Sequence, residues 1–358
     1  MKRRIGILTS GGDCPGLNAA IRGVARASYE LFDAEFVGIA DGYKGLIEGD
    51  YRDMTENDFK GILTLGGTIL GTSRRPYRNM RKIEEDNVNK VEAMKANYRK
   101  MKLDCLVTLG GNGTHKTANL LAGEGLNVIG LPKTIDNDIW GTDVTFGFHT
   151  AVDIATDVVD RIHTTANSHG RVMVIELMGN KAGWLTLYAG VSGGADIILL
   201  PEIPFDLDKV IAMVEKRTKE RQRSFSIIAI AEGAFRQDES SLKRKERLAR
   251  LKEHNYPSTA YQLADQIQGQ TGLETRVVVP GHYQRGGSPS PYDRLLATQF
   301  GVYAANLIKD ENYGQTVAML GGKVGHNPLR EIAGKTKLVP PDHQIVQAAR
   351  DMGVSFGE

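Results

Sequence analysis

The chain is 358 residues long, is 41% hydrophobic and 25% charged, and carries a formal net charge of +2. That length exceeds what one hydrophobic core usually organises, so we expect two domains. The near-neutral charge argues against a nucleic-acid or membrane-surface binder, and no apolar run approaches the ~20 residues of a membrane span. Two cysteines without metal-ligand spacing, Cys14 and Cys105, and no secretion signal predict a cytoplasmic protein with reduced thiols.

Predicted strands and helices alternate along the chain. Short apolar runs predict strands at 4–9, 35–40, 104–109, 127–131, 172–176, 196–200, 226–231, 275–279 and 315–320. Helical periodicity lies between most of them, at 18–32, 149–165 and 207–220 among others, and the charged stretch 236–255 is expected to be a solvated helix or loop. This alternation favours parallel sheets covered by helices on both faces, in which ligands bind at the carboxyl ends of the strands.

Glycine clusters follow several predicted strands, and the chain contains 41 glycines in all. The sequences SGGD at 10–13 and GGNGT at 110–114 are each expected to end a strand and open a helix. Backbone N–H groups in such turns, together with a helix N-terminus, can bind phosphate oxygens. Neither a Walker A lysine motif nor GxGxxG is present, which disfavours a P-loop enzyme and a dehydrogenase.

The segment PKTIDND at 132–138 directly follows a predicted strand. Of its two carboxylates, one can accept a proton from an attacking hydroxyl while the other holds a divalent cation or orients its neighbour. Lys133 beside them can neutralise a phosphoryl group. A turn rich in Asn and Asp that caps a helix is the alternative interpretation.

Four cations of the second half border predicted strands: Arg171, Arg276, His282 and Arg285. The planar guanidinium group of arginine matches phosphate oxygens in pairs. Together these side chains would suit a sugar-phosphate dianion whose hydroxyl Asp136 deprotonates. Ordinary surface ion pairs are the alternative.

A series of motifs, in the same order, resembles the 6-phosphofructokinase family from about Lys2 to Gly301. The motifs are SGGDCPGLNAAIRG, GGTILGTSR, LGGNGT, PKTIDNDIWGTD, FGFHTA, SHGRVMVIELMG and GHYQRGGSPSPYDR. NAD kinases and lipid kinases share loops like GGNGT, but such enzymes would not explain the last motif. The resemblance implies a homotetramer and an α/β fold of two Rossmann-like three-layer domains with mostly parallel sheets and the active site in the cleft between them. A nucleotide-binding domain is expected at 1–140 plus about 258–305, and a sugar-phosphate-binding domain at 141–257 plus about 306–358.

The resemblance also implies roles for individual residues. Asp136 corresponds to the proton acceptor, Thr134 to a residue that contacts the transferring phosphoryl group and the substrate, and Asp138 to a second acid. Contacts to the sugar phosphate are implied for Met178, Gly179, Asn180, Glu232, Arg276, His282 and Arg285, and Arg171 is expected to reach the substrate of a neighbouring subunit. Contacts to the nucleotide are implied for Gly12, Tyr43, Arg74, Gly111, Asn112, Gly113, Thr114 and Lys133.

The chain departs from the family pattern at several positions. Asn112 stands where the family usually has an acid associated with Mg²⁺, so the ion is expected to depend on Asp138, the Asn112 carbonyl and the phosphates of the donor. Asn180 replaces an active-site arginine. Lys133 is typical of pyrophosphate-dependent members, whereas Gly113 is typical of members that use ATP.

The sequence therefore predicts an ATP-dependent 6-phosphofructokinase of glycolysis. With Mg²⁺, it would transfer the γ-phosphoryl group of ATP to the C1 hydroxyl of fructose 6-phosphate and give fructose 1,6-bisphosphate. The alternatives are an enzyme that uses pyrophosphate and a catalytically weak regulatory or binding subunit, the latter suggested by Asn112 and Asn180. Regulation is left open, because basic positions of the bacterial effector site are matched only in part: Arg22, Arg26, Arg221 and Arg223 are present, but His163 stands where an arginine is usual.

Overall fold

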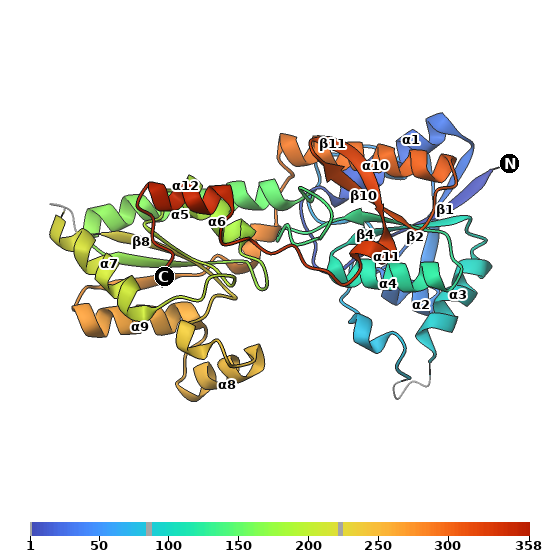
Figure 1. The fold of residues 1–358 in the computed structure, drawn as a ribbon. Helices are drawn as coiled ribbons and strands as arrows, with labels where there is room; N and C mark the ends of the chain where they lie inside the picture. The colour runs from blue at the N-terminus through green and yellow to red at the C-terminus, as the bar shows by residue number, and fades with distance from the viewer. Residues whose placement is uncertain (1, 84–87, 221–224) are drawn as a thin grey trace. The chain divides into compact units, whose positions relative to one another are not determined.

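The computed structural model describes residues 2–83, 88–220 and 225–358, so Arg221 and Arg223 lie outside the described residues. The chain forms two compact units (Figure 1). The first comprises Met1–Thr150 and Arg285–Lys337, and the second comprises Ala151–Gln284 and Leu338–Glu358. These limits differ from those expected from the sequence, which placed 258–284 with the first unit, and 141–150 and 306–337 with the second. Strand pairing explains the difference, because the strand at 275–278 pairs in the second sheet and the strand at 315–320 pairs in the first.

The first unit is built on a seven-stranded sheet with the order β11-β10-β5-β4-β1-β2-β3. Its strands are β1 (Arg3–Ser10), β2 (Ala34–Ile39), β3 (Tyr51–Met54), β4 (Cys105–Gly110), β5 (Val128–Pro132), β10 (Gln315–Leu320) and β11 (Lys323–Pro328). The predicted strands are confirmed to within about two residues, and the interior of the sheet is parallel. The edge strands β3 and β11 pair antiparallel and were not predicted, since partly exposed edge strands lack a continuous apolar run.

Helices cover both faces of this sheet (Figure 1). On one face lie α1 (Leu17–Leu31) and α10 (Pro291–Lys309), and on the other lie α2 (Tyr43–Glu48), α3 (Lys90–Lys100) and α4 (Asn112–Gly123), with the short α11 (Leu329–Ile332) against α4. The predicted helix at 18–32 is confirmed as α1. Buried side chains from β1, β2 and β4 pack with those of α2, α3 and α4 into one hydrophobic core. This core fixes the central strands against the helices on that face of the sheet.

Helices α1 and α10 approach so closely that their backbones touch at two glycines. A Cβ atom added to Gly301 would lie 2.5 Å from the carbonyl oxygen of Ala20 and 2.7 Å from the backbone nitrogen of Val24. A Cβ atom added to Gly23 would lie 2.8 Å from the carbonyl oxygen of Thr298. Glycine is therefore needed at this crossing for packing and not for a special backbone conformation.

The Gly301→Ala variant is expected to unfold at a lower temperature than the wild type. Alanine is the better helix former by about 1 kcal/mol, but the overlap with backbone atoms forces the two helices apart, and overpacking of this kind costs about 1–3 kcal/mol. Gly123→Ala is the matched control, because this helical glycine of α4 has no atom within 4 Å of its added Cβ. Thermal unfolding followed by circular dichroism compares the two, and equal midpoints would contradict the packing argument.

The second unit contains a four-stranded parallel sheet with the order β7-β8-β6-β9. The strands are β6 (Val172–Leu177), β7 (Ile197–Leu199), β8 (Ser226–Ala231) and β9 (Thr275–Val278). Helices α6 (Trp184–Ser192) and α12 (Gln344–Asp351) lie on one face, and α7 (Leu207–Glu220) and α9 (Thr259–Thr271) lie on the other (Figure 1). Two further α-helices of the described residues are α5 (Phe148–His169), whose first residues belong to the first unit, and the charged α8 (Arg244–Glu253).

The predicted helix at 207–220 is confirmed as α7, and the one predicted at 149–165 continues to His169. Within the ranges that the structure describes, no helix is both long and apolar enough to cross a membrane. Cys14 and Cys105 are both buried free thiols.

Candidate active site

The order of strands in the first unit creates a crevice at the carboxyl ends of β1 and β4. From β1 the chain passes through α1 to β2 on one side, and from β4 it passes through α4 to β5 on the other. Helices α1 and α4 lie on opposite faces of the sheet, so the connections that follow these neighbouring strands diverge. Such a switch point is where open parallel sheets bind their ligands.

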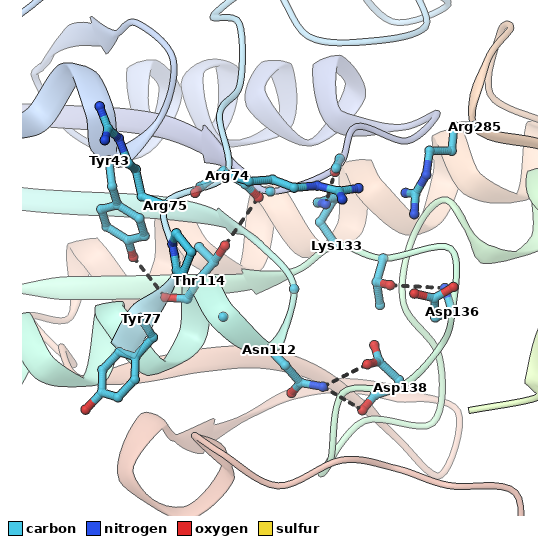
Figure 2. Close-up of a pocket in the computed structure, with 17 residues that line it drawn as sticks. Tyr43, Arg74, Arg75, Tyr77, Asn112, Thr114, Lys133, Asp136, Asp138 and Arg285 are labelled. Atoms are coloured by element: carbon cyan, nitrogen blue, oxygen red, sulfur yellow. Dashed lines mark hydrogen bonds between the residues drawn. The ribbon is translucent and has the colours of Figure 1, made fainter. Parts of the chain in front are cut away.

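A pocket of about 380 Å³ occupies this position (Figure 2). All of its lining residues belong to the first unit. They are Ser10, Gly11, Gly12, Tyr43, Arg74, Arg75, Pro76, Tyr77, Gly111, Asn112, Gly113, Thr114, Lys133, Thr134, Asp136, Asp138 and Arg285. The pocket thus brings together every residue predicted to contact a nucleotide, along with the three predicted catalytic residues and Arg285. Ser10 and Gly11 belong to the predicted SGGD turn, whereas Arg75, Pro76 and Tyr77 are lining residues that the sequence analysis did not name.

The glycine-rich turn after β4 presents a helix N-terminus to the pocket. Helix α4 begins at Asn112, directly after β4, and the Tyr43 hydroxyl donates a hydrogen bond of 2.9 Å to the carbonyl oxygen of Thr114 in its first turn. The Thr114 hydroxyl in turn donates to the carbonyl oxygen of Ser10 at 3.2 Å and ties this turn to the end of β1 (Figure 2). The free N–H groups of this turn and the helix dipole make it suited to an anion.

The turn after β1 differs from the prediction. The SGGD sequence does not open a helix, because α1 begins only at Leu17, after Gly16 in the left-handed region with φ 105°. Gly11 has φ 93° in this turn, a conformation that favours glycine. The turn therefore contributes backbone and not a helix dipole to the pocket.

Two glycines of these turns occupy different surroundings. A Cβ atom at Gly12 would lie 2.8 Å from Nη1 of Arg285 and 3.3 Å from Nη2 of Arg74, so a larger residue would displace both guanidinium groups. A Cβ atom at Gly113 would meet no atom within 4 Å, and the φ of Gly113 is not positive. Space next to the start of α4 is therefore open at Gly113 and filled at Gly12.

Three cations converge around Gly12. The buried Lys133 ammonium donates to the carbonyl oxygen of Gly12, and the ends of Arg74 and Arg285 lie beside its Cα position, as just described. The Arg285 Nη1 also donates to the carbonyl oxygen of Asp13 at 3.3 Å. Burial lowers the pKa of Lys133, with the nearby Arg285 adding to that effect. Clustered cations in a partly desolvated site bind phosphoryl oxygens strongly, so the pocket is electrostatically suited to a polyphosphate.

His115 is a residue that sequence reasoning missed. It is fully enclosed, its Nδ1 lies 3.0 Å from the carbonyl oxygen of Gly111, and its Nε2 lies 2.9 Å from the hydroxyl of Thr316. Burial lowers the pKa of His115 to about 4, so the ring is neutral at pH 7. Its contacts join the start of α4 to β10 and so fix the position of the turn between β4 and α4. The signal in the sequence was only its position in the first turn of a helix.

The loop after β5 carries the two carboxylates into the pocket. The Asp136 backbone N–H donates to the Thr134 hydroxyl at 3.0 Å, and the Thr145 hydroxyl donates to the Thr134 carbonyl oxygen at 2.8 Å. Asn137 sits between the two acids with φ 49°, a left-handed conformation that asparagine tolerates, and turns its neighbours on both sides towards the pocket. Asp136 and Asp138 therefore line one cavity although they are not adjacent in sequence.

Asp138 lies next to Asn112 (Figure 2). The Asn112 amide donates to Asp138 Oδ2 at 2.9 Å and to the Asp138 carbonyl oxygen at 3.2 Å. Burial raises the pKa of Asp138, and the hydrogen bond from Asn112 opposes that rise. Carboxylate and amide oxygens are both ligands that Mg²⁺ accepts, so this pair fits a cation that takes its other ligands from elsewhere. In the described ranges, no three His, Cys, Asp or Glu side chains are clustered for a metal ion.

The remaining predicted residues belong to the second unit and fall into two groups. Those at the carboxyl end of its sheet are Met178, Gly179, Asn180, Glu232 and His282, which follow β6, β8 and β9. At this end the Glu232 backbone N–H donates to the Leu177 carbonyl oxygen at 2.9 Å, which places Glu232 beside Met178.

Arg171 and Arg276 lie at the other end of the same sheet. Arg171 immediately precedes β6, and Arg276 is the second residue of β9, so both lie at the amino ends of parallel strands. Both arginines pair with Glu274, with 2.9 Å between Arg171 Nε and the Glu274 carboxylate, and Arg171 is the main cause of the lowered pKa of Glu274. A six-residue strand spans about 20 Å. The structure therefore does not gather the four predicted cations around one phosphate within a single copy of the chain.

The model of the family described as Phosphofructokinase matches residues 4–308. The chain belongs to the phosphofructokinase family. A relative phosphofructokinase from Spirochaeta thermophila, named ATP-dependent 6-phosphofructokinase, is 58% identical over 99% of this chain and 98% of its own length. Another from Bacteroides thetaiotaomicron, named ATP-dependent 6-phosphofructokinase 3, is 46% identical over 99% of this chain and all of its own length.

Relatives in this phosphofructokinase family are not uniform in their named donor. The pyrophosphate–fructose 6-phosphate 1-phosphotransferase of Amycolatopsis methanolica is 44% identical and covers 95% of this chain and 97% of its own length. Among solved structures, the phosphofructokinase of Saccharomyces cerevisiae superimposes with a TM-score of 0.78 at 31% identity and covers 92% of this chain and 45% of that one. The mixed α/β architecture with mostly parallel sheets is thus that of a phosphofructokinase.

Proposed function

We propose that this phosphofructokinase transfers the γ-phosphoryl group of ATP to the C1 hydroxyl of fructose 6-phosphate. The observation that carries the proposal is 58% identity, over nearly the whole of both chains, to a relative named ATP-dependent 6-phosphofructokinase. The pocket supports it, because an anion-binding helix N-terminus, three converging cations and two carboxylates line one cavity. A glycolytic enzyme of this kind works in the cytoplasm, and we propose that location.

Each group of the pocket has a place in this reaction. The phosphates of ATP would lie against the first turn of α4, with Lys133 and Arg74 neutralising charge that builds up on the transferring group. Asp136 accepts the proton of the sugar hydroxyl, and Thr134 positions the loop and the phosphoryl group. Holding donor and acceptor in line supplies most of the remaining acceleration, because the protein does little covalent chemistry in such transfers.

Mg²⁺ is the cation that we propose at Asp138 and Asn112. Mg²⁺ commonly takes one or two protein ligands and completes its shell with phosphate oxygens and water, which matches one carboxylate and one amide carbonyl at this position. When bound, the ion would stabilise negative charge on the phosphates of the donor. Binding it requires the Asn112 side chain to turn its carbonyl oxygen and not its NH₂ group towards the ion.

Pyrophosphate is the second candidate donor, and a specific observation favours it. Lys133 lines the pocket and donates to Gly12, and a relative that is 44% identical is named a pyrophosphate-dependent enzyme. A purified-enzyme assay with fructose 6-phosphate and Mg²⁺ compares ATP with pyrophosphate directly. We expect a higher kcat/KM with ATP. The absence of activity with both donors would instead favour the regulatory subunit that Asn112 and Asn180 suggest, although Thr134, Asp136 and Asp138 are all retained in the pocket.

We further propose that fructose 6-phosphate binds at the carboxyl end of the second sheet and that Arg171 and Arg276 serve the substrate of a neighbouring copy in a homotetramer. The separation of these arginines from Glu232 and Met178 along the strands supports this arrangement. A residue that completes the site of another subunit makes oligomerisation part of substrate binding.

The Arg171→Ala variant is expected to raise KM for fructose 6-phosphate by tenfold or more, since a charge-assisted contact to phosphate contributes about 1.5–3 kcal/mol. KM for ATP should change much less. Steady-state kinetics with each substrate varied in turn makes the comparison. Arg161→Ala is the matched control, because Arg161 is an exposed arginine paired with Asp157 on α5. An active monomer that binds fructose 6-phosphate normally would rule out the shared site.

A further inference from the structure

Lys337 lies beside the loop that carries the catalytic carboxylates. It is the last residue of the first unit, and its backbone N–H donates to the carbonyl oxygen of Asp138 at 2.8 Å. Next to it, Thr336 forms an antiparallel bridge with Ile139. The segment that ends the first unit is thus paired with the end of the 132–138 loop.

The ammonium group of Lys337 makes three further contacts to the same region. Its Nζ lies 3.0 Å from Asn137 Oδ1, 2.8 Å from the carbonyl oxygen of Thr142 and 2.9 Å from the carbonyl oxygen of Asp143. An ammonium group has three N–H donors and no acceptor, so the number of donors matches the number of these oxygens. A neutral amine has only two N–H groups and would face one of the oxygens with a lone pair.

Asn137 is the residue through which Lys337 reaches the two acids. Asn137 is buried, adopts a left-handed conformation between Asp136 and Asp138, and also accepts a hydrogen bond of 3.2 Å from the Thr145 backbone N–H. Without the Lys337 ammonium group, Asn137 Oδ1 would keep the Thr145 N–H as a donor and the Thr142 carbonyl oxygen would lose the Lys337 donor. The Asp143 carbonyl oxygen would keep the 3.4 Å hydrogen bond from the Asn137 amide. The direction in which Asp136 and Asp138 point depends on this conformation.

Charge at the site is compatible with an ammonium group. Burial lowers the pKa of Lys337 to about 8, and Asp143 and Asp138 oppose that shift. The three acceptor oxygens around Nζ favour the charged form, which has all three donors.

We propose that Lys337 is a positioning residue for phosphoryl transfer, which holds the 134–138 loop through Asn137 so that Asp136 and Asp138 face the pocket. The proposal rests on the proposed function of that site. The family model ends at residue 308, so Lys337 lies in a part of the chain that the family match does not reach. Its contribution is to geometry and not to substrate contact, since Lys337 is not among the residues that line the pocket.

The test compares Lys337→Met with Lys335→Met in the full-length enzyme. Methionine keeps the length of the lysine stem and removes its donors, and Lys335 is an exposed lysine two residues away. Because a misplacement of about 1 Å can cost 10²-fold in rate, we expect Lys337→Met to lower kcat by about 10–100-fold. KM for ATP and for fructose 6-phosphate should stay within about threefold, and Lys335→Met should behave like the wild type. Lys337→Arg, which keeps donors and charge, should restore part of the lost kcat.

Tryptophan fluorescence gives a readout that does not require catalysis. Trp140 is exposed and lies two residues after Asp138, whereas Trp184, the other tryptophan of the chain, is buried in the second unit. Release of the loop should change acrylamide quenching of Trp140 in Lys337→Met and not in Lys335→Met. This change in quenching is expected even if the proposed sugar-phosphate substrate is wrong. The fluorescence test therefore distinguishes a failure of the positioning role of Lys337 from a failure of the proposed function.

The proposal is overturned if Lys337→Met retains kcat within twofold of Lys335→Met. It is also overturned if the loss in kcat is not selective, that is, if substrate binding and thermal stability are impaired to the same degree as kcat. Should Lys337→Met not fold, Lys337→Gln takes its place, because the shorter amide keeps a polar end but cannot serve all three oxygens. A wild-type kcat in Lys337→Gln would then reject the positioning role.

Discussion

The Asp136→Asn variant is expected to lose about 10²–10⁴-fold in kcat with fructose 6-phosphate and ATP, the usual contribution of a general base. Asparagine keeps the size of the side chain and cannot accept the proton. The loop should keep its shape, because Asp136 is fixed through its backbone N–H bond to Thr134 and the loop through Thr145. The loss should therefore appear in kcat and kcat/KM alike, with KM for ATP little changed.

Asp53→Asn is the control for this variant, because Asp53 is an exposed carboxylate of the same unit that pairs with Arg4. Circular dichroism and thermal unfolding of both proteins show whether the fold is kept. If Asp136→Asn turns over at nearly the wild-type rate, Asp136 is not the base. Asp138, whose pKa is raised by burial, would then be examined next by the same substitution.

The Gly113→Asp variant is expected to depress kcat/KM for ATP by about 10³-fold. Nothing lies within 4 Å of a Cβ atom at Gly113, so the residue leaves room for the α-phosphate and the rest of a nucleotide. An aspartate would occupy that space and place a negative charge near an anion. At an effective ε of 20, two unit charges 4 Å apart interact by about 4 kcal/mol, which corresponds to roughly 10³-fold. Activity with pyrophosphate, which has no nucleoside to exclude, should fall less.

Stability and activity should move in opposite directions in this variant. Residue 113 lies in the first turn of α4, where an acid interacts favourably with the helix dipole. We therefore expect thermal unfolding to show no loss of stability, which would separate the loss of activity from unfolding. Gly113→Asn separates size from charge, and we expect it to lose less activity than Gly113→Asp.

Lys133→Gly should lower kcat with either donor, because a cation beside the transferring phosphoryl group stabilises charge in both reactions. A wild-type enzyme that prefers pyrophosphate over ATP by tenfold in kcat/KM would overturn the choice of donor.

The sequence by itself determined the parallel strands, the family and most of the residues that line the pocket of the first unit. Buried parallel strands are continuous apolar runs, and β1, β4 and β5 could be read directly because each is fully enclosed along most of its length. Residues at the carboxyl ends of neighbouring parallel strands lie near one another, which is why Gly12, Asn112 and Asp136 line the same pocket.

Only the tertiary structure decided features that depend on partners distant in the chain. The edge strands β3 and β11 form because neighbours offer them hydrogen bonds, and the strand at 315–320 belongs to the first unit because it pairs with β5. Arg171 and Arg276 border strands just as His282 does, but strand direction sends them to the opposite end of the sheet. In the sequence alone, nothing distinguishes Lys337 from the other lysines of the chain. Its three acceptors are supplied by residues about 195 positions earlier, and local patterns carry no information about contacts at such separations.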